Sequence, residues 1–307
     1  MPLTEKLISS FLAFELDIDI NSPIHSIRAD AIKKFEELGF PNRKLENWKY
    51  TSLNRIIKED YTVFSKKKNV IDFKKVQDYF IDNIESYKII FVDGYFDPFL
   101  SQTSHDGLDI CIMSAALSKA KYSKIINKFF NKSTNSEDSL TSLNTAFSKE
   151  GAYIHIPKNT VLDKPVEIIH FSTGNEAALM LQPRNLVVVE ENSEVEIIES
   201  HQSLTVNPIF TNSVTEIFAQ KNSNVDYYKI QNDVITSSLV DNTYISQKRN
   251  SEVKVHTFSF GGKLIRNNLN FYQKDKAINS TMKGVTIIDD DQISRSSYFS
   301  TSCKSEL

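Results

Sequence analysis

The four-residue phrase Asn-Ser-x-Val returns at regular intervals in the second half of the chain. Three copies begin at Asn192, Asn222 and Asn250, and a degenerate fourth copy is Asp275–Ile278. Each copy closes on a β-branched residue, in order Val195, Val225, Val253 and Ile278. These closing residues are 30, 28 and 25 positions apart. A repeat of roughly 20–50 residues is typical of a solenoid, in which each unit buries its apolar face only against its neighbours. We therefore expect the four closing residues to stack in one inward-facing column.

A second phrase, built around an asparagine, interleaves with the first. Its asparagines are Asn185, Asn212, Asn242 and Asn267. Asparagine suits the corners of a solenoid because it tolerates the left-handed backbone conformation and hydrogen-bonds its own backbone. Asparagines stacked in successive turns can also form ladders of side-chain hydrogen bonds.

From Tyr153 onward the apolar residues follow the period of two that indicates β-strands. The strand candidates cover residues 153–156, 166–171, 178–181, 186–189, 195–199, 214–219, 225–231, 243–247, 253–260, 264–271 and 278–288. A β-sandwich also has many short strands, but it would not return the same phrase at the spacing of one turn. The sequence therefore predicts a mainly β protein whose core is a parallel β-helix, with a β-helix domain at residues 151–307.

Residues 1–150 predict a mostly helical N-terminal α/β region. Its expected elements are two helices within residues 1–40, a strand at 89–92 closed by the turn pair Asp93-Gly94, and a helix at 140–147. Residues 131–139 are rich in Ser, Thr and Asn, and they predict an exposed linker.

Composition argues against several classes of protein. The 307 residues include 36 basic and 39 acidic side chains, and the net charge of −3 gives no reason to expect nucleic acid or an anionic membrane as a partner. There are 8 glycines and no glycine-rich phosphate loop, which disfavours nucleotide binding. The sequence has no signal peptide pattern and no apolar stretch of membrane-spanning length, so we expect a soluble, cytoplasmic protein.

No catalytic or cofactor-binding pattern stands out. The histidines are His25, His105, His155, His170, His201 and His256, and none forms an H-x-x-x-H pattern, so we expect surface or solenoid-turn positions rather than ligands. Glu194 and Glu196 should share one solvated outward face, because alternate residues of a strand point the same way. Cys111 and Cys303 are too far apart for a disulfide framework or zinc motif. Cys303, next to Lys304, is the single candidate metal ligand.

The only tryptophan lies in a charged segment whose notable residues are Arg43, Lys44, Glu46, Trp48, Lys49 and Tyr50. One interpretation is a packed turn, in which the two aromatic side chains anchor the segment and Glu46 pairs with Arg43 or Lys44. The other interpretation is a binding surface. Composition alone favours the packed turn.

The phrase Arg-Lys-x-Glu-x-Trp-Lys-Tyr-Thr at Arg43–Thr51 resembles the N-terminal signature of SufD, in the SufB/SufD family of scaffold subunits of the SUF iron–sulfur cluster assembly machinery. Further matches follow in the family's order at Phe91–Phe96, Leu143–Phe147, Pro183–Ser193, Thr211–Glu216, Tyr228–Gln231 and Gly261–Asn267. The resemblance runs from about residue 40 to the end, and its Arg-Asn and Gly-Gly stretch is shared with SufB.

The resemblance implies a right-handed parallel β-helix between a helical N-terminal region and a C-terminal helical domain. It implies a non-enzymatic scaffold that pairs with SufB through the β-helix and carries the ATPase SufC on the C-terminal domain. Family members continue beyond the point that corresponds to Leu307. We therefore expect this chain to lack that domain, to self-associate and to fail to capture SufC. An iron–sulfur cluster is expected only in the assembled complex, and the chain alone should hold none and turn over no ATP.

Two other classes of function remain open from the residues alone. A β-helix carbohydrate-active enzyme would need a cluster of carboxylates or basic groups on one outer face, and usually a secretion signal. A purely structural solenoid would need neither the helical N-terminal region nor the segment Arg43–Leu53. The sequence favours the non-catalytic scaffold over both.

Overall fold

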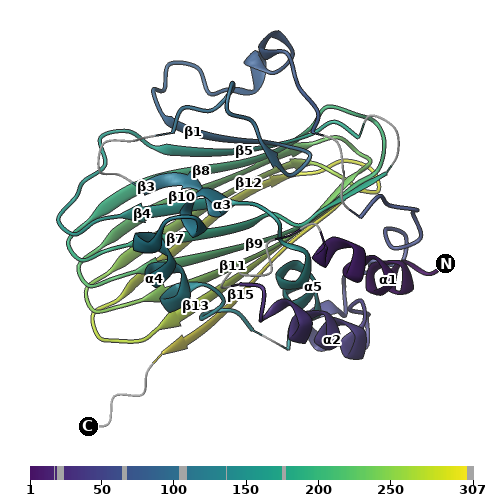
Figure 1. The fold of residues 1–307 in the computed structure, drawn as a ribbon, viewed down its shortest axis with the longest axis horizontal. Coiled ribbons are helices and arrows are strands. Elements are labelled where there is room, and N and C mark those ends of the chain that lie inside the picture. Colours follow the sequence, from purple (N-terminus) through teal and green to yellow (C-terminus); the bar gives the residue numbers. More distant parts are fainter. Residues whose placement is uncertain are drawn as a thin grey trace.

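The computed structural model describes residues 1–16, 18, 24–63, 68–103, 109–135, 137–174 and 178–302. Two stacked β-sheets form the body of the molecule (Figure 1). The first sheet contains β1 (Tyr87–Val92), β2 (Tyr95–Phe96), β5 (Val166–Ser172), β8 (Glu194–Ser203), β10 (Asn224–Asp233), β12 (Glu252–Gly261) and β14 (Asn279–Ile287). The second contains β3 (Asp109–Ile112), β4 (Ala152–Ile156), β7 (Arg184–Val189), β9 (Ile209–Ala219), β11 (Ser237–Gln247), β13 (Leu264–Gln273) and β15 (Ile293–Ser302). The short β6 (Leu179–Leu181) pairs with β9.

From β7 onward successive strands alternate between the two sheets, so the chain winds as a β-solenoid. The strand order is β14-β12-β10-β8-β5-β1-β2 in one sheet and β15-β13-β11-β9-β7-β4-β3 in the other. Only the β1–β2 and β3–β4 pairs are antiparallel among the described strands. The parallel β-helix predicted from the repeats is confirmed, and a strand occupies each predicted position. The strands β2, β3 and β15 were not predicted.

The inward column of valines is confirmed for three turns and wrong for the fourth. Val225 lies opposite Val195 on one side and Val253 on the other, and all three are buried. Val253 pairs with Ser280, however, and not with Ile278. The left-handed corner residue of that turn is Ala277, with φ 55°, in the place that Asn250 holds one turn earlier with φ 58°. The fourth copy therefore begins two residues later than its sequence suggests.

The asparagines of the second phrase do not share a column. Asn185 pairs with Thr215, and Asn212 pairs with Val240. The corner asparagines of the first phrase do stack. Amide side chains join Asn192 to Asn159 at 2.8 Å, Asn222 to Asn192 at 2.8 Å and Asn250 to Asn222 at 3.1 Å. The four residues have φ between 57° and 59°. This corner therefore uses both the left-handed conformation and the side-chain ladder expected of asparagine.

Substitutions at Asn222 separate the ladder from the backbone conformation. We expect Asn222→Ala to lower the free energy of unfolding by about 1–2 kcal/mol, because an alanine at positive φ is strained and the two ladder bonds are lost. Asn222→Gly loses the same bonds without the strain, and its loss should be smaller. Urea unfolding measures both variants. Equal losses would show that the bonds, and not the positive φ, set the requirement for asparagine.

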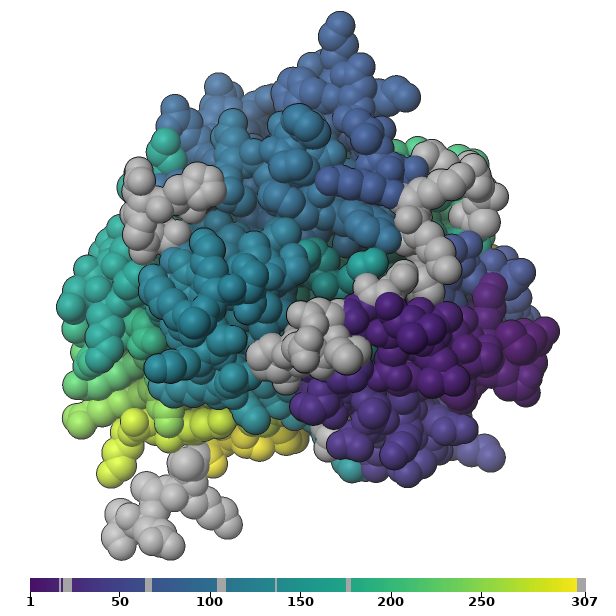
Figure 2. All heavy atoms as spheres, viewed as in Figure 1, coloured from purple at the N-terminus to yellow at the C-terminus, as the bar shows by residue number. Residues whose placement is uncertain are grey.

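Helices cover the second sheet in two groups. One group, α1 (Leu3–Glu15), α2 (Arg28–Leu38) and α5 (Ser139–Phe147), packs Phe14, Phe35 and Phe147 toward Phe210 and Val240 at the start of β9 and β11. The other group, α3 (Met113–Leu117) and α4 (Ala120–Phe129), lies over β4, β7 and β9. In Figure 2 these groups are the purple and blue-teal atoms in front of the solenoid. None of the described helices is both long and apolar enough to cross a membrane.

The N-terminal half also contributes strands to the solenoid, because β1 pairs with β5 and β3 pairs with β4. The predicted turn Asp93-Gly94 closes the β1–β2 hairpin with φ values of 50° and 80°. Short 3-10 turns are found at Glu46–Trp48, Phe73–Lys75 and Gln77–Tyr79. The two helices expected within residues 1–40 are α1 and α2, and the helices α3 and α4 were not predicted from the sequence.

Candidate functional site

The interior of the solenoid changes from apolar to polar along two neighbouring strands. The inward side chains of β8 are, in order, Val195, Ile197, Glu199 and His201. Those of β10 are Val225, Tyr227, Lys229 and Gln231. All eight are buried, and the period of two brings each to the same face. Burying a charged group costs much free energy unless the group is paired, so the charged side chains of this layer should have partners.

Three side chains that can bind a metal gather in this layer. His170 of β5 stands opposite His201 of β8 in the parallel ladder, and their rings stack with centroids 4.6 Å apart and an interplanar angle of 9°. The Nε2 atom of each ring lies 3.4 Å from Oε1 of Glu199. The other face of His170 stacks on Phe91 at 5.1 Å. One ligand atom from each of the three residues lies within 4.8 Å of the others.

The Glu199 carboxylate is held in place by hydrogen-bond donors from three strands. Asn185 donates its side-chain N–H to Oε1 at 2.9 Å, and Thr215 donates to Oε2 at 3.4 Å. The hydroxyl of Tyr227 donates to Oε2 as well. Burial by itself raises the pKa of the Glu199 carboxyl, but the attraction of the two imidazoles outweighs burial and holds that pKa well below its ordinary value. Burial lowers the pKa of His170. The group therefore combines an ionised carboxylate with an uncharged imidazole.

The next turn of the solenoid buries an ion pair beside this group. The ammonium of Lys229 contacts the carboxylate of Asp241 and donates to Thr243 Oγ1 at 2.9 Å. Both charged side chains are at most 2% exposed. Gln231, two residues after Lys229 in β10, exchanges two amide hydrogen bonds of 2.7 and 3.0 Å with Asn267 of β13. The polar layer therefore contains both charged and neutral groups.

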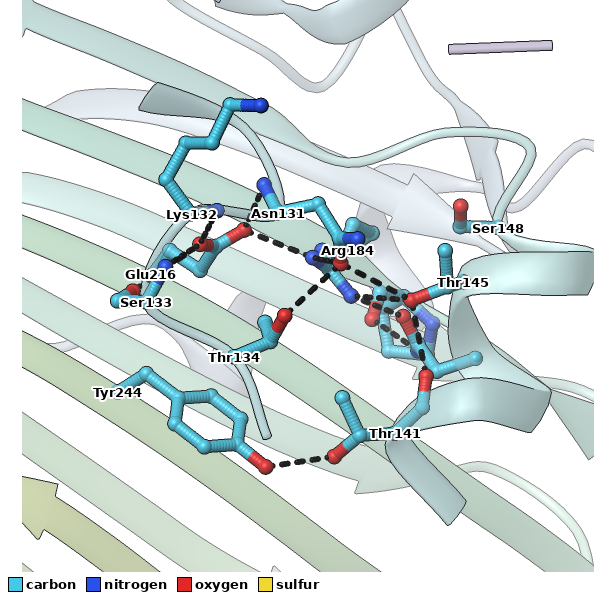
Figure 3. A network of polar contacts seen from close by, with 12 residues as sticks. Asn131, Lys132, Ser133, Thr134, Thr141, Thr145, Ser148, Arg184, Glu216 and Tyr244 are labelled. Carbon is cyan, nitrogen blue, oxygen red and sulfur yellow. Dashed lines mark hydrogen bonds and ion pairs between the residues drawn. The ribbon is translucent and has the colours of Figure 1, made fainter. Parts of the chain in front are cut away.

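A second buried network fixes the N-terminal region to the outside of the second sheet (Figure 3). The carboxylate of Glu216 in β9 receives the guanidinium of Arg184 from β7 at 2.7 Å. It also accepts the backbone N–H groups of Asn131, Lys132 and Ser133 at 2.6, 3.1 and 3.1 Å. The sequence predicted an exposed linker at 131–139, but Ser133 is buried. The cause of this difference is Glu216, which anchors the first three residues of the segment.

The guanidinium of Arg184 extends this network to α5. It donates to the side chains of Asn144 at 3.3 Å and Thr145 at 3.1 Å. The Asn144 amide in turn donates to the backbone oxygens of Pro183 and Asn212, both at 2.8 Å. Two sequence motifs that are about forty residues apart, Leu-Asn-x-Ala-Phe and Pro-Arg-Asn, therefore meet in one contact.

The tryptophan segment is fixed by the other Arg-Asn motif. The guanidinium of Arg266 lies 4.0 Å from the centre of the Trp48 ring, and it donates to Asn47 O at 2.7 Å and to Thr51 Oγ1 at 3.0 Å. Trp48 is buried. The remaining predicted signature residues are all exposed, namely Arg43, Lys44, Glu46, Lys49 and Tyr50. Tyr50 lies between two cations, with Lys49 Nζ at 5.5 Å from the ring and Arg295 at 5.2 Å.

The packed-turn interpretation made two predictions about this segment. The contacts confirm its buried aromatic anchor, but not its ion pair. Trp48 anchors the segment as expected. Within the described residues, however, Glu46 forms no ion pair with Arg43 or Lys44. Exposed charges gain little from pairing because water screens them.

The sequence located few of the residues that gather inside the solenoid. Glu194 and Glu196 are exposed, as predicted. His170 and His201 are solenoid-turn residues, as predicted, but they point inward with Glu199 and form a possible ligand set. The alternation of inward and outward residues along the strand could have located them. Every second residue after Val195 points inward, and this series includes Glu199 and His201. The candidate ligand Cys303 lies outside the described residues.

Comparisons with known proteins place the chain in a family. A model described as the SufBD protein N-terminal region matches residues 4–168, and one described as SUF system FeS cluster assembly, SufBD core domain, matches residues 170–304. An iron–sulfur cluster assembly SufBD family protein of Synechocystis is 27% identical over 275 residues, which cover 87% of this chain and 60% of that protein.

Two similar proteins carry the name SufD. The protein of Bacillus subtilis is 26% identical over 235 residues, which cover 73% of this chain and 51% of the relative. That of Escherichia coli is 23% identical over 235 residues, which cover 75% of this chain and 51% of the relative. The chain thus spans about half the length of these relatives. Because the N-terminal family model alone matches more than half of its residues, the chain belongs to the SufB/SufD family of the SUF iron–sulfur cluster assembly system.

Proposed function

We propose that this protein is a non-catalytic scaffold component of the SUF machinery for iron–sulfur cluster assembly. The observation that carries the proposal is the match of two successive SufBD family models at 4–168 and 170–304, on a chain that folds as the β-solenoid expected for that family. The buried placement of Glu199, Lys229 and Asp241 supports a scaffold, because these charged groups are enclosed by the two sheets and do not face an open cleft.

The proposed partners are SufB and SufC. The resemblance to SufD assigns the β-solenoid to pairing with SufB, and it makes the ATPase SufC the third component. An iron–sulfur cluster is then the cargo of the assembled complex and not a resident group of this chain. The alternative of a carbohydrate-active enzyme draws no support from the comparisons, since both matched models describe SUF proteins.

Co-purification tests this function directly. The tagged chain is expressed with SufB and SufC of the same organism and recovered from the tag. We expect SufB to be retained in a defined stoichiometry. SufC should not be captured by this chain directly, since the resemblance places the SufC contact on the C-terminal domain. A folded chain that does not retain SufB would contradict the proposed function.

A further inference from the structure

We propose that His170, Glu199 and His201 form a binding site for one first-row divalent cation, Zn²⁺ or Fe²⁺, inside the solenoid. The set offers two imidazole nitrogens and one carboxylate oxygen. Two histidines and one carboxylate are a recurring ligand set for catalytic zinc and for non-haem iron(II). This inference does not depend on the proposed function, since it concerns what the isolated chain binds.

The spacing of the three groups suits a tetrahedral metal ion. Metal–ligand bonds of about 2.0–2.1 Å at tetrahedral angles place neighbouring ligand atoms about 3.4 Å apart. The distance from Glu199 Oε1 to Nε2 is 3.4 Å for both His170 and His201. The two ring nitrogens are within 4.8 Å of each other, and a tilt of the stacked rings toward the carboxylate brings them to the same spacing.

The ring nitrogens themselves provide a second observation. The Nε2 atoms of His170 and His201 are buried, and beyond their 3.4 Å contacts with Glu199 Oε1 neither has a hydrogen-bond partner in the described part of the chain. Both side chains are 93% buried, and both nitrogens are directed at one carboxylate oxygen. Buried polar atoms without partners are rare in native proteins because each costs free energy. A cation between the two nitrogens and Glu199 would satisfy both.

The surroundings of Glu199 are those of an oriented metal ligand. Asn185 donates to Oε1, the oxygen that the two imidazoles face, and Tyr227 and Thr215 donate to Oε2, so the carboxylate is fixed at both oxygens. Partners of this kind orient the ligands of protein metal sites and raise their affinity.

A cavity borders one member of this group, His170. Its volume is about 50 Å³, and His170 forms part of its wall together with Tyr95, Lys149 and Gln182. A cavity needs only about 10–15 Å³ of such volume to hold one water molecule. The cavity can therefore hold water beside the His170 side chain.

The chemistry of the three ligands favours a single metal ion over an iron–sulfur cluster at this site. Iron–sulfur clusters are held mainly by cysteine thiolates, and the three groups include none. Imidazole suits zinc and iron, whereas Mg²⁺ prefers oxygen ligands and retains its water. Co²⁺ has an affinity between those of Fe²⁺ and Zn²⁺ in this series, so it is a suitable spectroscopic probe.

Titration of the chelator-treated chain tests the site. We expect one equivalent of Co²⁺ to bind with visible absorption bands, one equivalent of Zn²⁺ to displace it, and Mg²⁺ to have no effect. Anaerobic equilibrium dialysis with Fe²⁺ distinguishes the two candidate metals. The variants Glu199→Gln and His201→Gln should weaken Co²⁺ binding by about 100-fold or more, and Asn185→Ala by about 10–100-fold. His256→Gln, on the outer face of the same sheet, is the matched control and should bind normally.

A measurement on the unaltered chain covers the case in which a variant fails to fold. In the chain labelled with ¹⁵N-histidine, Zn²⁺ should shift the ring signals of two of the six histidines. The proposal is overturned if the folded chain binds less than a tenth of an equivalent of each metal, if no histidine signal shifts, or if folded Glu199→Gln and His201→Gln bind as tightly as the unaltered chain. Loss of metal binding leaves the SufB interaction to be judged separately by co-purification.

Discussion

Glu216→Ala is expected to lower the free energy of unfolding by about 3–5 kcal/mol, because it removes one partner of a fully buried ion pair. The guanidinium of Arg184 would then lie uncompensated between β7 and α5. Three backbone N–H groups, at 131–133, would lose their acceptor at the same time. Each buried donor left without a partner costs about 1–3 kcal/mol. Urea unfolding followed by tryptophan fluorescence measures the loss, since Trp48 reports on the N-terminal region.

Two further variants give this expectation its controls. Glu196→Ala removes an exposed carboxylate from β8 and should stay within about 0.5 kcal/mol of the unaltered chain. Arg184→Met leaves Glu216 bound to the three backbone N–H groups, so its loss should be smaller than that of Glu216→Ala. If Glu216→Ala costs less than about 1 kcal/mol, then the network of Figure 3 does not hold the N-terminal region to the sheet.

The two Arg-Asn motifs perform the same task at two places on the second sheet. Arg184 binds α5 and the segment that precedes it, and Arg266 binds the segment around Trp48. Both guanidiniums are at most 2% exposed. An arginine suits this position because its planar fork can donate in several directions and also stack on an aromatic ring. In this chain both Arg-Asn motifs therefore join the helical N-terminal region to the solenoid.

The sequence predicted the solenoid well because two independent periods agree. Apolar residues at every second position indicate the strands. The corner asparagines, which recur every 25–30 residues, indicate the turns of the solenoid. The prediction failed where the corner residue changed. Ala277 adopts the left-handed conformation that asparagine holds in the turns before it, and nothing in its side chain signals this. The phrase was therefore aligned two residues early, which placed Ile278 in a column that Ser280 occupies.

The metal-ligand group was missed for a different reason. His170 is 29 residues before Glu199, and no local spacing connects them. They meet because the parallel ladder sets His170 opposite His201, one turn of the solenoid later. Periods show which residues point inward, but only the register shows which of them are neighbours. The expectation of no ligand cluster rested on spacing within one segment, and that test cannot detect ligands from successive turns.

Val225→Asp is expected to prevent the solenoid from folding. Val225 is 1% exposed and packs between Val195 and Val253 in the interior column. Its burial is worth about 1.5–3 kcal/mol, and all of that is lost. The new carboxylate would also be buried beside two valines with no cation or donor, which adds the cost of an unpaired charge or of its protonation. A total above about 5 kcal/mol exceeds the effect of most single substitutions and is comparable to the stability of a whole domain.

The same substitution at an exposed valine separates burial from charge. Val206→Asp introduces an identical carboxylate where the side chain is 80% exposed, between β8 and β9, and it should change the free energy of unfolding by no more than about 0.5 kcal/mol. Val225→Thr keeps the shape and replaces one methyl group with a hydroxyl, so its effect on the free energy of unfolding should fall between the two. Circular dichroism and solubility after expression detect loss of the fold, and urea unfolding ranks the folded variants. A soluble Val225→Asp chain with native strand content and an unchanged midpoint would mean that this column is not closed to water. The solenoid would then owe its stability to its hydrogen-bonded ladders and corner asparagines more than to its apolar interior.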